Sequence, residues 1–364
     1  MSLDEARTKI DRIDAEIIRL LDERAGVGRE IGEIKRRLDL PPHNPGREHQ
    51  VIQRLLALSD GSMPARSLAG IYRVIMAETL ALQTEKASAV HCGGHDGAGK
   101  RDVVATVVEN VEAAPGFRRM RLLTPELAEV FAPGQFFQIR VGGTGSAFFL
   151  RRPFAPAENT SDGLAFYYAV VGGGTRALAD LQAGATVGVL APLGNAYSLT
   201  EAGTSVLLAG GGCGAPSLAP LARALRARGV RTTVLLGART SSVLLDQETF
   251  GHVADRLIIA TDDGSMGCRG TVVDACRIAR EDVGAFDRIY ACGPLPMLRA
   301  VAGLAREHGV ACEVSLEERM ACGFGACMGC VVPVLTGDAA SAFRRVCHDG
   351  PVFDSSLLAW DEMR

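Results

Sequence analysis

The sequence predicts a multidomain protein in which an all-helical N-terminal domain precedes a β-barrel, a parallel α/β domain and a small cysteine-bearing C-terminal domain. Three observations predict this order. A heptad pattern opens the chain, the apolar periodicity changes to short β-like runs after residue 101, and four of the ten cysteines gather near the C-terminus. The length of 364 residues fits two to three domains at roughly 150 residues each.

Composition excludes several classes of protein. With 47% apolar and 22% charged residues, the chain has ordinary globular usage and is not predicted to be disordered. A net charge of −3 and only 5% aromatic residues argue against a nucleic-acid partner. The charged amphipathic start argues against a signal peptide, and the long charge-free run at 204–222 is too rich in glycine and proline for a membrane span. We therefore expect a cytoplasmic protein with no membrane association.

The first domain, residues 1–86, is predicted to be all-helical. A helix over about residues 3–38 would be about 54 Å long at 1.5 Å per residue, too long for so small a domain unless it packs along a partner chain. Prolines at 41, 42 and 45 end this helix, and two more helices are expected at about 45–59 and 64–86. The apolar seam of the first helix consists of Ile10, Ile13, Ile17, Leu20, Val27, Ile31, Ile34 and Leu38.

A flexible linker and three further domains are expected after the helices. The glycine-rich segment 87–100 contains His91, Cys92 and His95, and we interpret it as a solvated linker rather than a metal site. A β-barrel is predicted at 101–200 from runs at 103–108, 135–141, 164–171 and 186–190. A parallel α/β domain is predicted at 201–315 from strands at 206–209, 232–236, 257–260, 288–291 and 311–314. The remaining residues, 316–364, hold the cysteine cluster.

Polar residues occur in the helical domain at spacings that indicate a binding site. Arg24 fills the one gap in the apolar seam, and Lys35 lies eleven positions later, where a helix returns to nearly the same direction. Thr79 and Gln83 are neighbours one turn apart on the third predicted helix. Several cations on one small bundle indicate a pocket for a dianion. The alternative is a coiled coil in which a single buried polar residue sets the register.

The segments "ARTKIDRIDAEIIRLLDERAGVGREIGEIK", "NPGRE" and "ETLALQ" resemble the all-helical chorismate mutases over residues 3–86. The resemblance implies an intertwined helical dimer that rearranges chorismate to prephenate. It also implies that two arginines hold the substrate carboxylates, one of them reaching into the other chain's site. The residues at the family's active-site positions are Arg7, Arg24, Lys35, Asn44, Arg47, Glu48, Thr79 and Gln83, with Asn44 standing where many members have Asp.

The cysteine cluster has the spacing of a plant-type 2Fe–2S site. Cys322, Cys327 and Cys330 follow a C-x4-C-x2-C pattern, and Cys347 comes sixteen residues later. Close glycines allow such a loop to wrap a cluster and direct amides at its sulfurs. A structural zinc site is the alternative, which this spacing disfavours because zinc sites usually show paired short spacings.

Four glycine- or proline-containing turns precede the cluster in a fixed order. They are "RRPFA" at 151–155, "GGGT" at 172–175, "GGGCG" at 210–214 and "CGP" at 292–294. Glycine-rich turns at strand ends let backbone amides approach a pyrophosphate. Each turn alone has an ordinary structural explanation, such as Cys292 being a small buried hydrophobe. The ordered set points to dinucleotide binding.

This order resembles the ferredoxin–NADP reductase superfamily, and "SLEERMACGFGACMGC" with "VCHDGPVF" resembles the electron-transfer subunits of NAD-dependent dihydroorotate dehydrogenases. The resemblance covers 101–358 and implies FAD, NAD and a 2Fe–2S cluster as cofactors. It also implies an FMN-containing catalytic subunit as partner, in a heterotetramer. By resemblance, Arg152, Pro153, Phe154, Gly174 and Thr175 contact FAD, and Gly211, Gly212, Gly214 and Cys292 line the NAD site.

Some positions depart from this family. Ala155 replaces the usual serine near the flavin, Cys213 a common aliphatic residue and Ser217 a common proline. Arg231 and Arg239 stand where a 2′-phosphate would be bound, so the choice of NAD over NADP rests on resemblance. The expected function is a bifunctional fusion. The alternative is an electron-transfer subunit for another flavoprotein, with the helical domain serving dimerisation or ligand sensing.

Overall fold

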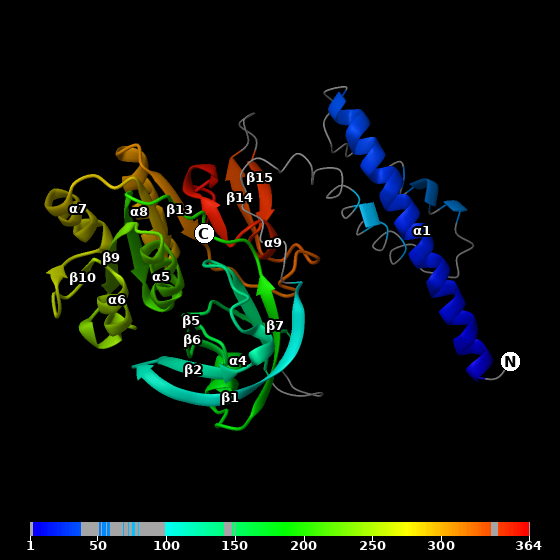
Figure 1. Ribbon diagram of the computed structural model, residues 1–364, viewed down its shortest axis with the longest axis horizontal. Coiled ribbons are helices and arrows are strands. Elements are labelled where there is room, and N and C mark those ends of the chain that lie inside the picture. The colour runs from blue at the N-terminus through cyan, green and yellow to red at the C-terminus, as the bar shows by residue number, and fades with distance from the viewer. Residues whose placement is uncertain are drawn as a thin grey trace. The chain divides into compact units, whose positions relative to one another are not determined.

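The computed structural model describes residues 3–37, 51, 53–55, 57–58, 68, 72, 75–76, 79, 99–141, 148, 150–335 and 341–363. The chain divides into two compact units, Met1–Gly94 and His95–Arg364. In the first unit, α1 (Leu3–Arg37) is one long helix (Figure 1). The described residues between 51 and 79 are all helical, in keeping with the expected helical domain. The linker residues 91, 92 and 95 lie outside the described part of the chain.

The second unit begins with a curled antiparallel sheet in the order β4-β3-β7-β1-β2-β6-β5. Its two edge strands are β4 and β5, so the predicted barrel is not closed by hydrogen bonds between them. Aromatic packing brings β4 against β6 instead, because the rings of Phe154 and Phe166 lie 4.8 Å apart. The strands are β1 (Arg101–Ala114), β2 (Phe117–Leu123), β3 (Phe136–Arg140), β4 (Arg152–Phe154), β5 (Glu158–Asn159), β6 (Gly163–Ala169) and β7 (Thr186–Leu193). A 3-10 turn, η1 (Pro125–Leu127), and a short helix, α4 (Gly173–Ala179), join this sheet.

A second sheet follows, in the order β11-β10-β9-β8-β12-β13-β16, and it is parallel except for its last strand. Alternate residues of β8 face opposite sides: Val206 and Leu208 pack with α5 and α6, whereas Leu207 and Ala209 pack with α7 and α8. Figure 1 shows these two helix pairs on opposite sides of the sheet. The strands are β8 (Ser205–Gly211), β9 (Arg231–Ala238), β10 (Arg256–Thr261), β11 (Cys268–Arg269), β12 (Arg288–Cys292), β13 (Ala311–Ser315) and β16 (Val352–Asp354). The helical segments are η2 (Gly212–Leu218), α5 (Ala219–Ala227), η3 (Ser241–Val243), α6 (Gln247–Val253), α7 (Val272–Val283) and α8 (Leu295–Glu307).

The C-terminal segment packs on this α/β core. The hairpin β14 (Val331–Leu335) and β15 (Ser341–Arg345) leads into α9 (Val346–Asp349), and β16 then joins the edge of the large sheet beside β13. A last 3-10 turn, η4 (Ser355–Leu357), follows. Val332, Val346 and Phe353 share one hydrophobic core with residues of α7 and α8. The cysteine-bearing segment is thereby fixed to the α/β domain. No described helix is long and apolar enough to cross a membrane.

Candidate functional site

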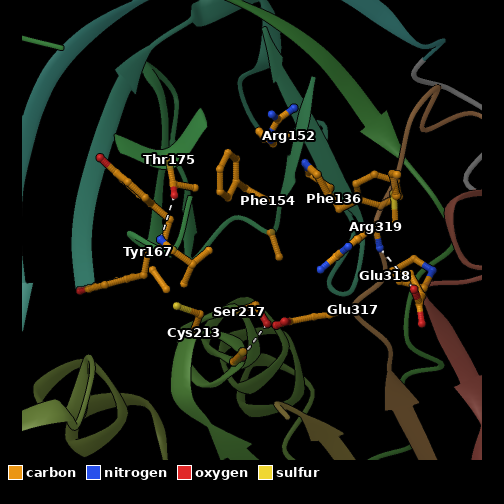
Figure 2. A pocket seen from close by; sticks show the side chains of 18 of the residues that line it. Phe136, Arg152, Phe154, Tyr167, Thr175, Cys213, Ser217, Glu317, Glu318 and Arg319 are labelled. Carbon is orange, nitrogen blue, oxygen red and sulfur yellow. Dashed lines mark hydrogen bonds between the residues drawn. The ribbon is translucent and has the colours of Figure 1, made fainter. Parts of the chain in front are cut away.

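The second unit contains a cavity of about 810 Å³ between the first sheet and the α/β domain. Figure 2 shows Arg152, Phe154 and Thr175 on the side of the first sheet and Cys213 and Ser217 on the opposite side. Glu317 points into the space between them. The volume lies in the upper range for small-molecule and cofactor sites.

All five predicted flavin residues lie in the wall of this cavity. Arg152, Pro153 and Phe154 reach it from the edge strand β4, and Gly174 and Thr175 reach it from the first turn of α4. A Cβ built on Gly174 would lie 2.8 Å from Arg152 Nε, so a side chain at this position would displace the guanidinium. The Thr175 hydroxyl accepts hydrogen bonds from the backbone N–H groups of Val171 and Gly172 at 3.0 and 3.1 Å. Thr175 therefore shapes the turn that precedes α4.

The predicted nicotinamide residues divide into two groups. Gly214 and Cys292 line the cavity, whereas Gly211 and Gly212 are not among its lining residues. Gly211 instead packs against α8, because a Cβ at Gly211 would lie 2.7 Å from the sulfur of Met297. Gly214 lies against the backbone of Cys292 and Gly293. A Cβ built on Gly214 would lie 2.7 Å from the backbone nitrogen of Gly293. The close approach of these two turns explains why both are rich in glycine.

Burial changes the protonation of groups in the cavity wall. Burial raises the pKa of the Cys292 thiol to about 12, with a further contribution from Glu317. Burial and the same carboxylate also raise the pKa of Cys213 to about 12. Burial raises the pKa of Glu317 itself. Both thiols therefore stay protonated at neutral pH, and they behave as neutral groups rather than as thiolate nucleophiles.

Sequence reasoning did not single out several residues in this wall. Tyr167 lines the cavity, donates its hydroxyl proton to Asp246 Oδ1 at 3.2 Å, and has a pKa raised by burial. Glu317 lies two residues after the end of β13. Ser217, which the sequence singles out only as a substitution, lies in η2, 3.3 Å from the Cys292 sulfur. A charged residue just after a parallel strand is the sequence signal for Glu317, since ligands bind at such strand ends.

The cluster cysteines lie in the loop after β13 and at the start of α9. Backbone N–H groups point at three of the sulfurs: Gly325 donates to Cys347 at 3.1 Å, Cys327 to Cys322 at 3.4 Å, and Cys347 to Cys330 at 3.4 Å. Burial raises the pKa of Cys322, but the amides of Phe324, Ala326 and Cys327 outweigh it, so that its pKa falls to about 7. Amides that favour thiolates suit an anionic iron–sulfur cluster.

The backbone of the cluster loop fits a wrapped group. Gly323 and Gly325 have φ angles of +78° and +94°, in the left-handed region that favours glycine. Within the described ranges, no three His, Cys, Asp or Glu side chains converge as they would around a single metal ion. A 2Fe–2S cluster does not require three side chains to converge on one metal ion, because its four cysteines bind two irons in separate pairs.

The helical unit brings together two of the residues predicted for the first site. The Arg24 guanidinium donates to the Thr79 hydroxyl and, at 3.3 Å, to the Ile75 carbonyl oxygen. Gly28 provides the space for this contact, because a Cβ there would overlap Thr79. Lys35 is half-buried on the same helix. Asn44, Arg47, Glu48, Gln83 and the Arg7 side chain lie outside the described residues.

Comparisons with known proteins find relatives of both the helical unit and the redox unit. The family Chorismate mutase type II matches residues 6–84, and the family Iron-sulfur cluster binding domain of dihydroorotate dehydrogenase B matches residues 317–359. The electron transfer subunit of dihydroorotate dehydrogenase B (NAD(+)) from Fusobacterium nucleatum is 37% identical over 69% of this chain and 96% of its own length. The corresponding subunit from Bacillus cereus is 39% identical over 68% of this chain and 94% of its own length.

Solved structures extend the comparison. An NADH-dependent reduced ferredoxin-NADP oxidoreductase matches with a TM-score of 0.64 and 32% identity, over 74% of this chain and 92% of that chain. The ferredoxin reductase of carbazole 1,9a-dioxygenase shares the fold, with a TM-score of 0.51 and 23% identity over 58% of this chain and 67% of that chain. The chain therefore belongs to the family of dihydroorotate dehydrogenase B electron transfer subunits and carries a chorismate mutase type II domain at its N-terminus.

Proposed function

We propose that this chain joins two activities, the rearrangement of chorismate to prephenate and electron transfer between NAD and an FMN-containing dihydroorotate dehydrogenase catalytic subunit. The observation that carries the redox proposal is the continuity of cavity and cluster. The cavity wall includes Ser315 through Met320, and the first cluster cysteine, Cys322, follows two residues later. A cofactor bound in the cavity is thus held beside the loop that holds the cluster.

The residues divide among three cofactors: FAD, NAD and a 2Fe–2S cluster. When bound, FAD supplies the change between hydride and single-electron chemistry that links NAD to the cluster. Arg152, Pro153, Phe154, Gly174 and Thr175 would hold FAD, and Gly211, Gly212, Gly214 and Cys292 would line the nicotinamide dinucleotide site. Cys322, Cys327, Cys330 and Cys347 would ligate the cluster.

The chain's own groups set the conditions in the cavity. The ring of Phe154 packs with Phe137 and Phe166, so the wall that carries it is rigid and apolar. Cys292 keeps its proton at neutral pH because burial raises its pKa to about 12. A neutral thiol beside a nicotinamide adds no charge that would favour one redox state of the nicotinamide over the other.

The helical domain would act by binding and electrostatics alone. The rearrangement is pericyclic, so it needs no nucleophile and no metal. Arg7 and Arg24 would bind the two carboxylates, and Lys35 and Gln83 would donate to the ether oxygen, where negative charge develops. Glu48 would hold the substrate hydroxyl, with Asn44, Arg47 and Thr79 supporting it. The contact of Arg24 with Thr79 supports this assignment, because it fixes the direction of the guanidinium.

The first unit is proposed to form an intertwined homodimer. Seven apolar residues of the α1 seam are between 41% and 56% exposed, as expected of a helix face that a second chain covers. The redox unit would in addition bind the catalytic subunit, giving a heterotetramer or a larger assembly. A cytoplasmic location is supported by nine free cysteines among the described residues, which suit a reducing compartment.

Two experiments test the two halves. Chorismate loss is followed with the purified chain and with Lys35→Ala. Turnover that the substitution abolishes supports the mutase, whereas no turnover from a folded dimer indicates a dimerisation or sensing module. For the redox half, cluster reduction by dihydroorotate is measured with and without a dihydroorotate-oxidising subunit. Reduction only in its presence supports the proposed partner. If the chain couples instead to a different flavoprotein, the partner assignment fails.

A further inference from the structure

The side-chain amide of Gln138 is completely buried and lacks a hydrogen-bond partner. Its exposed fraction is 0%, and neither Nε2 nor Oε1 is paired with any group in the described part of the chain. Leaving a buried amide unpaired is unfavourable, because the amide loses its hydrogen bonds to water on burial. Such an amide calls for an explanation, and a role beside a redox group is one of the established ones.

The position of Gln138 on β3 determines where its amide points. Phe137 and Ile139 belong to the core inside the curled sheet. Side chains alternate along a strand, so Phe136 and Gln138 point to the opposite face. Phe136 accordingly packs in the core that contains the C-terminal segment. Gln138 therefore faces away from the interior of the first sheet and toward the cluster-bearing segment.

The cluster loop lies close to that amide. A Cβ built on Gly323 would lie 2.5 Å from both Nε2 and Oε1 of Gln138. Gly323 directly follows Cys322, the first predicted cluster ligand. The amide thus lies against the cluster loop at its first cysteine. Because Gly323 has no side chain, the side-chain amide of Gln138 can lie directly against the backbone of the cluster loop.

The same strand also backs the flavin side of the cavity. Gln138 pairs with Pro153 across the β3–β4 ladder, and Pro153 lines the cavity. A second tie holds the cluster segment to this sheet, because Asn195 donates its backbone N–H to the Gly350 carbonyl oxygen at 2.7 Å. The first sheet and the cysteine-bearing segment are therefore in contact at two places. Gln138 occupies the boundary between the flavin side and the cluster side.

We propose that the Gln138 side-chain amide donates a hydrogen bond to a sulfur of the iron–sulfur centre at its Cys322 end and thereby raises the reduction potential of that centre. Cluster and cysteine sulfurs only accept hydrogen bonds, and the amide of glutamine offers two N–H donors. Such a bond is stronger to the reduced centre, which carries one more negative charge, and so it favours reduction. This inference rests on the 2Fe–2S assignment of the proposed function.

The test is a redox titration of the full chain loaded with FAD and cluster, followed by electron paramagnetic resonance of the reduced cluster. Gln138→Leu keeps the approximate volume and removes the donor. We expect the ratio of oxidised to reduced cluster at the wild-type midpoint to rise from one to about ten, equivalent to about 59 mV for a one-electron couple. Gln138→Met keeps the length of the side chain and also removes both N–H donors, and its midpoint should fall as well.

Gln135→Leu is the matched control. Gln135 lies three residues earlier, and its amide is satisfied by protein groups, accepting from Ala132 N and donating to Gly194 O, both at 3.0 Å. Its substitution should leave the cluster midpoint unchanged. If Gln138→Leu does not load a cluster, the Met variant decides the question. A wild-type midpoint in the Gln138 variants overturns the hydrogen bond, whereas a wild-type chain without a 2Fe–2S signal would refute the cluster itself.

Discussion

The hydroxyl of Ser217 lies 3.3 Å from the thiol sulfur of Cys292 and joins the segment after β8 to the end of β12 in the cavity wall. The same hydroxyl lies 2.7 Å from the Gly214 carbonyl oxygen, which can only accept. One hydroxyl proton cannot serve both contacts, so the thiol donates to Ser217 when the carbonyl takes that proton. The orientation of the Cys292 thiol therefore depends on Ser217.

Ser217→Ala should impair NADH oxidation. Losing one hydrogen bond of about 0.5–1.5 kcal/mol corresponds to a rate loss of roughly two- to tenfold. We expect the loss in kcat with ferricyanide as acceptor, and recovery in Ser217→Thr, which keeps the hydroxyl. Ser356→Ala, on an exposed turn where the hydroxyl bonds Asp354, is the control and should behave as wild type. An unchanged kcat in Ser217→Ala would contradict the positioning role.

Cys327→Ala should remove the cluster and spare the flavin. Cys327 is an exposed residue of the cluster loop, so its truncation leaves the hydrophobic core intact. The visible and paramagnetic signals of the cluster should disappear, while flavin absorbance and ferricyanide reduction by NADH remain. Cys276→Ala tests specificity, because Cys276 is buried among α7 and α8 residues and is predicted to ligate nothing. Cluster signals retained in Cys327→Ala would refute the ligand assignment.

Gly174→Ala should weaken flavin retention. Its new Cβ would lie 2.8 Å from Arg152 Nε, so the guanidinium must move away from its place in the cavity wall. A displaced cation loses a charge-assisted hydrogen bond of about 1.5–3 kcal/mol, which predicts roughly ten- to a hundredfold weaker FAD binding. Flavin loss on dilution, followed by fluorescence, measures this. Gly251→Ala, whose Cβ meets no atom within 4 Å, should keep FAD as wild type does.

Arg24→Ala should abolish chorismate turnover, whereas Arg19→Ala should not. Removing one positioned donor costs about 10²–10³-fold in comparable sites. Arg19 lies on the same helix but forms exposed ion pairs with Glu16 and Glu23, which contribute little to stability. Chorismate absorbance gives the rate, and sedimentation checks that each variant keeps its oligomeric state. Equal turnover in the two variants would place the site elsewhere.

Asp246→Asn should stabilise the protein at neutral pH. Burial raises the pKa of Asp246, so the folded state disfavours its charged form. Below the unfolded pKa both states are protonated and there is no penalty. As the pH rises from the pKa of Asp246 in the unfolded state to its raised pKa in the folded state, the free energy of unfolding decreases. Above the folded-state pKa the decrease is complete and stays constant. The melting temperatures of wild type and variant should converge in acid and separate at pH 7. A constant difference would show that the charge is not responsible.

The sequence by itself determined the features whose signals are local. The seam predicted a helix ending near residue 38, and the described α1 extends to Arg37. Cysteine spacing identified the cluster loop, and the strand after residue 205 was expected before its glycine-rich turn. These patterns can be recognised without the tertiary structure, because helix period, strand alternation and ligand spacing each extend over only a few residues.

The tertiary structure decided which distant segments meet. The placement of β16 beside β13 brings the Cys347 segment to the edge of the large sheet, and no local pattern predicts that pairing. Glu317, Tyr167 and Ser217 come from three separate elements of the cavity wall. Gln138 looked like an ordinary strand residue in the sequence. Its significance appears only where Gly323, far along the chain, lies against its unpaired amide, because contact between remote segments depends on how the whole core packs.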